Sequence, residues 1–140
     1  MARTLAAALG MTLLALLCAC ASATGLRPGP DGAPPPGGMT MLYPQKPEAI
    51  LEAAIRDLPQ IGLHVVEIDP AGRYLLAERG VNATSNGENV GVYLAPGKDG
   101  TSVTVVSRRK TPTNVMARDF TLPVHMQLGA SLGRQNQPRP

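Results

Sequence analysis

The chain has 140 residues, which suits one small domain with accessory segments. Its formal net charge is +3, from 13 Lys and Arg against 10 Asp and Glu, and this excess is too small to indicate a nucleic-acid-binding protein. Aromatic residues make up only 3% of the sequence, so the core has to be built mainly from aliphatic side chains.

The first residues have the three parts of a secretory signal peptide. Arg3 supplies a positive charge, residues 5–17 form an apolar run, and small residues follow. A membrane span needs roughly 20 apolar residues, so this run is too short to anchor the protein unaided. A buried core helix is the alternative, but such a helix would carry a polar stripe and this run carries none. We therefore expect the protein to be exported.

The chain has two cysteines, Cys18 and Cys20, and both follow this run. A disulfide between residues so close in sequence has poor geometry, and a zinc site would need a second cysteine pair. The stretch LCAC, residues 17–20, instead resembles the lipobox of bacterial lipoproteins, at which signal peptidase II cuts. That pattern has an aliphatic residue, a small residue and an invariant cysteine in the places of Leu17, Ala19 and Cys20. Cys18 occupies a place where Ala, Ser, Thr or Val is more usual.

The lipobox resemblance implies that Cys20 becomes the lipidated N-terminus, with diacylglycerol on its thiol and a further acyl chain, such as palmitate, on its amine. Three chains exceed what stable anchoring needs. Residue 21 is Ala and not Asp, which by analogy with lipoprotein sorting favours the outer membrane, with the domain facing the periplasm. The competing interpretation is cleavage by signal peptidase I after the A-x-A match at 21–23, which would release a soluble periplasmic protein.

Residues 25–38, GLRPGPDGAPPPGG, contain five Pro and five Gly. This composition opposes both helix and sheet, because Pro lacks the N–H and Gly has excess backbone freedom. The triple proline favours polyproline II, and a mostly extended tether from Ala21 to Tyr43 would reach about 50–70 Å. We therefore divide the chain into a signal peptide, a lipidated cysteine with a Pro/Gly-rich tether, a folded domain and a disordered tail: residues 1–19, 20–38, 39–133 and 134–140.

Residues 47–58, PEAILEAAIRDL, predict the first helix of the folded domain. Pro47 suits a first-turn position, and Glu48 complements the helix dipole. Pro59 and Gly62 would end the helix. Apolar residues recur at intervals of three and four along one face, which we expect to be buried: Leu51, Ala54, Ile55 and Leu58.

Alternating and β-branched residues predict four strands after this helix: 62–69, 73–79, 90–96 and 101–108. A type I turn signature at 69–72 and the GKDG turn at 97–100 indicate antiparallel neighbours.

The last predicted element is a helix over 121–133. Thr121 would cap it, Gly133 would end it, and apolar residues at i+4 spacing would face the core: Val124, Leu128 and Leu132. The order α-β-β-β-β-α predicts an α+β two-layer sandwich, in which a four-stranded antiparallel sheet carries the N- and C-terminal helices on one face and leaves the other open.

No constellation in the sequence indicates catalysis. His64 and His125 lie far apart without metal-binding spacing, and the chain has neither a G-x-S-x-G elbow nor a phosphate-binding loop. We expect no metal, no cofactor and no enzymatic activity. The alternative from another class is a small hydrolase, which would require His64 or His125 to lie buried beside an Asp and a Ser in a cleft.

Arg108, Arg109 and Lys110 form the densest basic cluster of the chain. A solvated strand end is the simpler interpretation, and the sharper one is contact with an anionic partner, either lipid headgroups or an acidic envelope protein. The sequence thus predicts a lipid-anchored periplasmic lipoprotein with a non-catalytic binding or accessory role. Its contact surface would be the open sheet face or an edge strand. A soluble periplasmic ligand-binding domain is the alternative, and no motif in the domain indicates a family.

Overall fold

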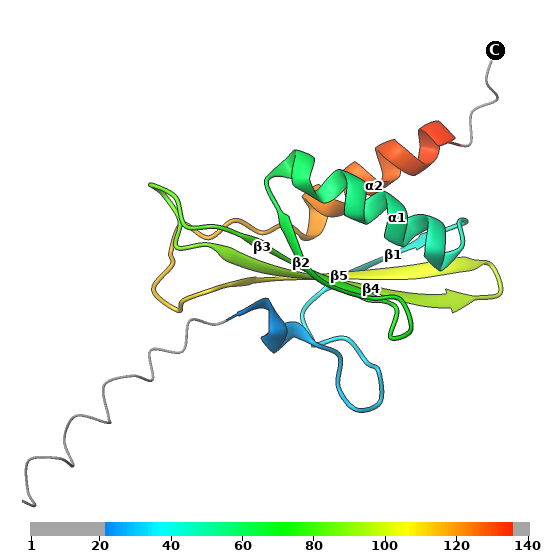
Figure 1. The fold of residues 1–140 in the computed structure, drawn as a ribbon, viewed down its shortest axis with the longest axis horizontal. Helices are drawn as coiled ribbons and strands as arrows, with labels where there is room; N and C mark the ends of the chain where they lie inside the picture. The colour runs from blue at the N-terminus through cyan, green and yellow to red at the C-terminus, as the bar shows by residue number, and fades with distance from the viewer. Residues whose placement is uncertain (1–21, 136–140) are drawn as a thin grey trace, which may run out of the picture.

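The computed structural model of the chain describes residues 22–135 (Figure 1). Leu17, Ala19 and Cys20, on which the lipobox resemblance rests, lie outside the described residues, as do positions 136–140 of the expected tail. Within the described range, no helix has the length and apolar character needed to cross a bilayer.

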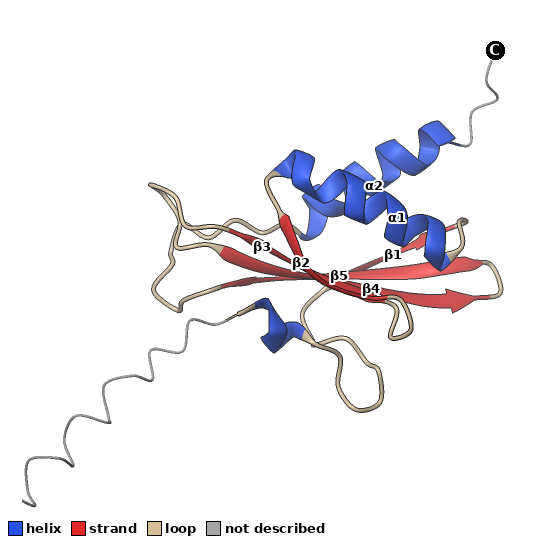
Figure 2. Cartoon of the chain, viewed as in Figure 1, coloured by secondary structure: helices blue, strands red, loops and turns tan. Residues whose placement is uncertain are grey.

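A five-stranded antiparallel sheet and two α-helices make up the domain (Figure 2). In chain order the elements are η1 Ala23–Leu26, β1 Met39–Tyr43, α1 Pro47–Asp57, η2 Leu58–Ile61, β2 His64–Asp69, β3 Tyr74–Arg79, β4 Glu88–Gly97, β5 Gly100–Arg109 and α2 Thr121–Gln135. The strands lie in the order β1-β5-β4-β3-β2, with every neighbouring pair antiparallel. Both helices cover the same face of the sheet (Figures 1 and 2). The predicted α+β class is confirmed.

The prediction of four strands was wrong, because β1 precedes α1 and the element order is β-α-β-β-β-β-α. β1 is an edge strand that pairs with β5, from Met39 opposite Val105 to Tyr43 opposite Thr101. Its sequence, MTMLY, has no clear apolar and polar alternation, and Leu42 is 61% exposed. The strand therefore depends on pairing with a distant segment, which a local pattern does not reveal.

Helix α1 forms where the sequence predicts it, but its buried face is rotated. Leu51, Ala54 and Leu58 are buried as expected, whereas Ile55 is 38% exposed and Ile50 is fully buried in its place. The rotation follows from the two surfaces that α1 meets, since it contacts both the sheet and α2.

Helix α2 also forms where expected, with Val124, Leu128 and Leu132 buried. It begins at Thr121 as predicted, but its capping group and its end differ from the prediction. The Thr121 N–H donates to Asp119 Oδ1 at 2.8 Å, so a carboxylate outside the helix serves the first turn. Gly133 does not end the helix, which continues to Gln135, two residues into the predicted tail.

The main core lies between the helices and the sheet and is almost entirely aliphatic. Burial of each of these larger side chains stabilises the fold by about 1.5–3 kcal/mol. The fully buried members include Ile50, Leu58, Leu63, Leu75, Val90, Val92, Val103, Val105 and Leu128.

The opposite face of the sheet is not open, because residues 22–38 fold back across it. We call these residues the N-terminal segment; η1 lies within it, beneath the strands (Figure 1). Ala23 and Leu26 are buried there, since residues three apart in a 3₁₀-helix lie on the same side. They complete a second apolar cluster with side chains of β3, β4 and β5: Tyr74, Leu76, Tyr93 and Val106. The predictions of an extended tether and an open sheet face were therefore wrong.

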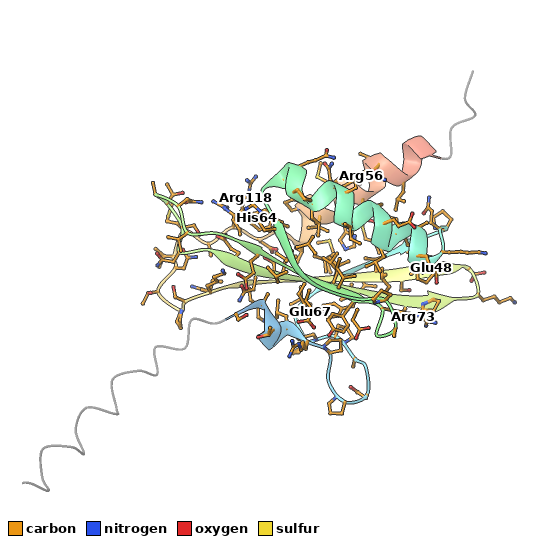
Figure 3. All side chains as sticks on the ribbon, viewed as in Figure 1. Glu48, Arg56, His64, Glu67, Arg73 and Arg118 are labelled. Carbon is orange, nitrogen blue, oxygen red and sulfur yellow. The ribbon has the colours of Figure 1, made fainter. Side chains whose placement is uncertain are left out.

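Polar contacts also attach the N-terminal segment to the sheet. The Ala23 N–H donates to Glu78 Oε1 at 2.9 Å. The Arg27 guanidinium makes hydrogen bonds of 2.8–3.1 Å to Glu67, whose side chain points toward the segment (Figure 3).

Two further hydrogen bonds end on carbonyl oxygens of the N-terminal segment. The Tyr93 hydroxyl donates to Leu26 O, and Arg108 Nη2 donates to Pro36 O at 3.1 Å. The composition of the segment correctly excluded a long helix or strand, but it could not exclude packing.

Acidification is expected to weaken this attachment. The Lys110 ammonium, and then the Ala23 N–H, hold the pKa of the Glu78 carboxyl below its ordinary value of 4.5. Because the ionised carboxylate is the acceptor, its stabilising effect is fully present above that ordinary value and is lost as the pH falls through the lower folded-state pKa. We expect the Ala23 amide proton in NMR spectra to move upfield as Glu78 is protonated, with an apparent pKa below 4.5.

The control for this titration is Glu78→Gln, which keeps a side-chain oxygen but removes the ionisable group. The pH-dependent movement of the Ala23 resonance should disappear in this variant. An Ala23 resonance in the unsubstituted chain that titrates with an apparent pKa at or above 4.5, or that moves equally in Glu78→Gln, would contradict the contact.

Candidate functional site

Two loops leave the sheet at the same end. One spans residues 80–87 between β3 and β4, and the other spans 110–120 between β5 and α2. They are neighbours because Glu88, which begins β4, lies opposite Arg109, which ends β5. A groove of about 220 Å³ runs between them, lined by residues 82–86 and 113–116. We call residues 79–88 and 109–119 together the loop end.

Glu88 organises the loop end. Its side chain is fully buried, and Oε1 accepts hydrogen bonds from Ser85 Oγ at 2.6 Å and from the Arg118 N–H at 2.9 Å. Oε2 lies 3.6 Å from Arg79 Nε. One carboxylate therefore connects β3 and both loops.

Asn114 makes a second connection between the loops. It is 4% exposed, and its Nδ2 donates to Ser85 Oγ and to Gly87 O, each at 3.1 Å. The Lys110 N–H also donates to Gly87 O, at 3.0 Å. Gly87 has φ +93°, and a Cβ there would lie 2.6 Å from Arg79 O, so this turn requires glycine.

Phe120 holds two of the cations at the loop end. Its ring is buried, and the guanidinium groups of Arg79 and Arg118 lie 5.6 Å and 5.8 Å from the ring centre. At this distance a guanidinium is attracted to the aromatic face. The Phe120 N–H donates to Ser107 Oγ at 3.1 Å, which attaches this residue to β5.

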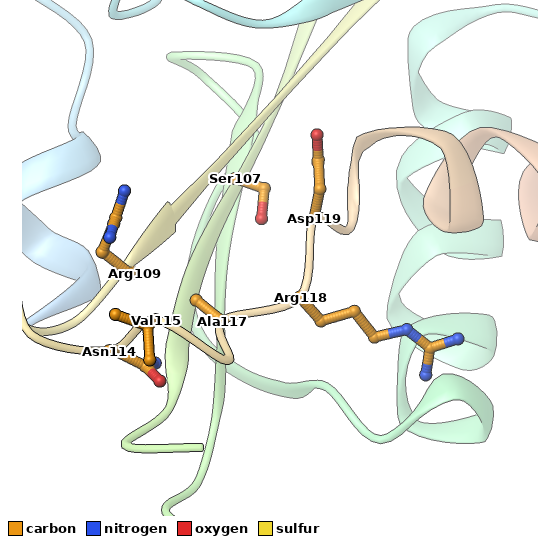
Figure 4. Close-up of a pocket in the computed structure, with 7 residues that line it drawn as sticks. All are labelled: Ser107, Arg109, Asn114, Val115, Ala117, Arg118 and Asp119. Carbon is orange, nitrogen blue, oxygen red and sulfur yellow. The ribbon is translucent and has the colours of Figure 1, made fainter. Parts of the chain in front are cut away.

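A second groove, of about 210 Å³, lies between β5 and the 110–120 loop (Figure 4). Seven residues line it: Ser107, Arg109, Asn114, Val115, Ala117, Arg118 and Asp119. Figure 4 shows that the side chains of Arg109 and Arg118 extend in different directions. The two guanidinium groups therefore do not converge on a single small anion.

The structure divides the predicted basic cluster. Successive strand residues point to opposite faces, so Arg108 lies on the face of the N-terminal segment and Arg109 on the other. Arg109 Nη1 donates to Pro112 O at 3.2 Å, and Lys110 Nζ is paired with Glu78 at 2.7 Å. Lys110 is thus neutralised, whereas Arg108 and Arg109 are exposed side chains whose hydrogen bonds end on carbonyl oxygens.

Sequence analysis missed the exposed apolar side chains of the loop end. Val81 is 73% exposed, Val115 84% and Met116 66%. The signal in the sequence was the presence of these apolar residues inside segments otherwise rich in Asn, Thr and Pro. Sequence analysis also missed Glu88 and Asn114, since neither belongs to a recognisable motif.

The two histidines do not form a catalytic group among the described residues. His64 is exposed on β2 (Figure 3). His125 is 3% exposed, with Nδ1 2.9 Å from the Tyr43 hydroxyl and Nε2 3.0 Å from Met39 O. Both ring nitrogens of His125 are occupied by contacts that attach α2 to β1, so it lacks the free nitrogen that a general base requires. Nor do the described residues contain a group of three or more His, Cys, Asp or Glu side chains arranged to hold a metal.

Comparison with known proteins provides no relative from which a function could be transferred: no family model matches the chain, and no curated protein matches it.

Proposed function

We propose that the protein is a lipid-anchored envelope lipoprotein whose α+β domain acts by binding at the periplasmic face of the outer membrane. The anchor is Cys20, in the lipobox pattern that Leu17 and Ala19 complete. The observation that carries the proposal furthest is the attachment of the chain to the sheet immediately after the predicted anchor. Ser22 follows Cys20 by two positions, and Ala23 is attached to Glu78, next to the loop end.

This geometry supports an anchor close to the domain. Three residues of chain reach at most about 11 Å, so Cys20 lies within about that distance of Ala23. A free tether would instead allow the domain to move 50 Å or so from the bilayer, at about 3.1 Å per residue. The lipid-anchored domain would therefore work at the membrane surface.

The burial of Ala23 favours this proposal over a soluble periplasmic protein. Cleavage by signal peptidase I after Ala23 would leave Thr24 as the first residue and remove Ala23 from the chain. That product would lose a fully buried side chain and the hydrogen bond to Glu78. Cleavage before Cys20 keeps both contacts.

The proposal is tested by the intact mass of the protein purified from membranes of an expressing two-membrane bacterium, beside Cys20→Ala and Cys18→Ala chains. We expect the mass of residues 20–140 plus three acyl chains, lost in Cys20→Ala and kept in Cys18→Ala. An unmodified chain that begins at Thr24 would overturn the lipid anchor and leave a soluble periplasmic domain.

A further inference from the structure

We propose that the loop end is a membrane-docking face, at which Val81, Val115 and Met116 enter the interfacial layer of a bilayer while Arg109 and Arg118 contact anionic headgroups. The inference rests on the proposed function for the position of the anchor. It goes further in giving the folded domain an orientation and a lipid affinity of its own.

The apolar side chains are the first observation. Val81 comes from one loop, and Val115 and Met116 come from the other, so both loops present apolar side chains to solvent. Val115 and Met116 line the groove whose other wall begins at Asn82, the residue after Val81. Apolar side chains grouped in this way among polar neighbours mark a site of contact with a partner or a membrane. The Glu88 and Asn114 contacts join the two loops and present these side chains from one connected frame.

Charge is the second observation. Residues 78–88 and 107–119 carry five Lys and Arg against three Asp and Glu. Glu78 is paired with Lys110 and Glu88 is fully buried, which leaves Asp119, an acceptor for the Thr121 N–H, as the one exposed carboxylate of these two ranges. Arg109 and Arg118 remain exposed, and a guanidinium matches the geometry of a phosphate group. Each such cation near an anionic surface raises membrane partitioning roughly fivefold.

The position of the anchor favours a bilayer over another protein as the partner that contacts the loop end. Ala23, three residues after Cys20, lies at the same end of the sheet as the two loops, because it contacts Glu78 and Glu78 lies next to Arg79. With lipid attached at Cys20, this end is the part of the domain nearest to the bilayer. The apolar loops and the exposed arginines would then meet the two layers that suit them, the interface and the headgroups.

A single tryptophan tests the proposal, because the chain has none of its own. We would place it at Val115 by Val115→Trp in the full acylated chain and reconstitute the protein into vesicles of phosphatidylcholine and phosphatidylglycerol with brominated acyl chains. Bromine quenches tryptophan on contact. The matched control is Leu42→Trp, at a position that is 61% exposed in β1 and pairs with Ser102, near the opposite end of β5. Seven residues of strand separate Ser102 from Arg109, about 23 Å.

Strong quenching of the Val115→Trp chain, without quenching of the Leu42→Trp chain, is the expected result. Equal quenching of the two would overturn the orientation. Absence of quenching in both, with the protein still bound to the vesicles, would overturn the docking face and leave the anchor intact. A blue shift of the Val115→Trp emission that depends on protein concentration and not on vesicles would overturn it in favour of contact with a second copy.

A second experiment tests the contact with the headgroups. In the Val115→Trp chain, Arg109→Gln with Arg118→Gln should lower the ratio of docked to undocked domain by about 25-fold on vesicles that contain phosphatidylglycerol, from about fivefold per cation. No change is expected on phosphatidylcholine alone, and an equal loss on both would overturn the anionic contact. If the purified chain proves to be unacylated, the same Val115→Trp chain is titrated with vesicles. Quenching would then support docking without the anchor, and its absence would overturn docking as well.

Discussion

Replacing Glu88 by Ala is expected to lower the free energy of unfolding by about 3–5 kcal/mol, the range for removing one member of a buried charged network. The carboxylate is fully buried, and its removal leaves Ser85 Oγ and the Arg118 N–H without their acceptor. Each such unsatisfied buried donor costs roughly 1–3 kcal/mol. Arg79 loses its opposite charge as well. We therefore expect the two loops to separate at denaturant concentrations well below global unfolding of the unsubstituted chain.

Urea unfolding followed by circular dichroism measures the change in the free energy of unfolding. The rate of trypsin cleavage after Lys110 and Arg118 measures how often the loops separate. Glu88→Gln keeps an oxygen acceptor and should lose about 1–2 kcal/mol, as expected for a network that loses its charge and keeps a hydrogen bond. Glu52→Ala, at an exposed position of α1, is the matched control and should change stability by less than about 0.5 kcal/mol. Glu88→Ala within about 1 kcal/mol of the original chain, with unchanged cleavage, would contradict the bridging role.

Local periodicity was sufficient for most of the fold. Helix α1 and the four strands β2 to β5 formed where spacing and turn chemistry predicted them, because each repeats a strong pattern over at least six residues. Periodicity failed where a segment takes its structure from a distant partner. β1 is such a segment, since MTMLY becomes a strand only by pairing with β5. The prediction that Ile55 is buried was wrong for a related reason, because the packing of α1 against two neighbours decides which side of the helix is buried.

The N-terminal segment shows the limit of composition as a guide. Its Pro and Gly content excludes regular secondary structure, and only the short η1 turn forms. Packing needs no long element, however, and two small apolar side chains with a few hydrogen bonds attach it to the sheet. No pattern in Ala23–Leu26 indicates which surface these side chains meet.

The candidate site was visible in the sequence only in part. Arg108 to Lys110 stood out as a charge cluster, but strand alternation and the Glu78 pair divide it. Glu88 and Asn114 are ordinary residues whose roles follow from the register between β4 and β5, which brings their loops together. The lipobox residues remain a prediction from resemblance alone.

Replacing Gly91 by Val is expected to release the N-terminal segment while the rest of the domain stays folded. Gly91 lies in β4, where the ring of Tyr93 covers it, and a Cβ at this position would lie 2.1 Å from the Tyr93 hydroxyl oxygen. Tyr93 must then swing away, which breaks its hydrogen bond to Leu26 O and uncovers Leu26. The loss of the hydrogen bond and of leucine burial amounts to about 2–4 kcal/mol, reduced by up to about 1 kcal/mol because Val suits a strand better than Gly.

Hydrogen exchange measured by mass spectrometry separates the segment from the core. In Gly91→Val the amides of residues 23–27 should exchange at least about fivefold faster, since the smallest net local loss, about 1 kcal/mol, corresponds to that factor. The amides of α1 should be unchanged. Tyr93→Phe is the matched control, because it removes the hydroxyl and keeps the ring over Gly91, and it should give a smaller acceleration. Unaltered exchange of residues 23–27 in Gly91→Val would mean that Tyr93 does not hold the segment.

If the segment is released as expected, the domain gains a spacer of about 50 Å, at about 3.1 Å per residue, between Cys20 and β1. Quenching of a Val115→Trp probe in the same chain should therefore fall together with the protection of Ala23.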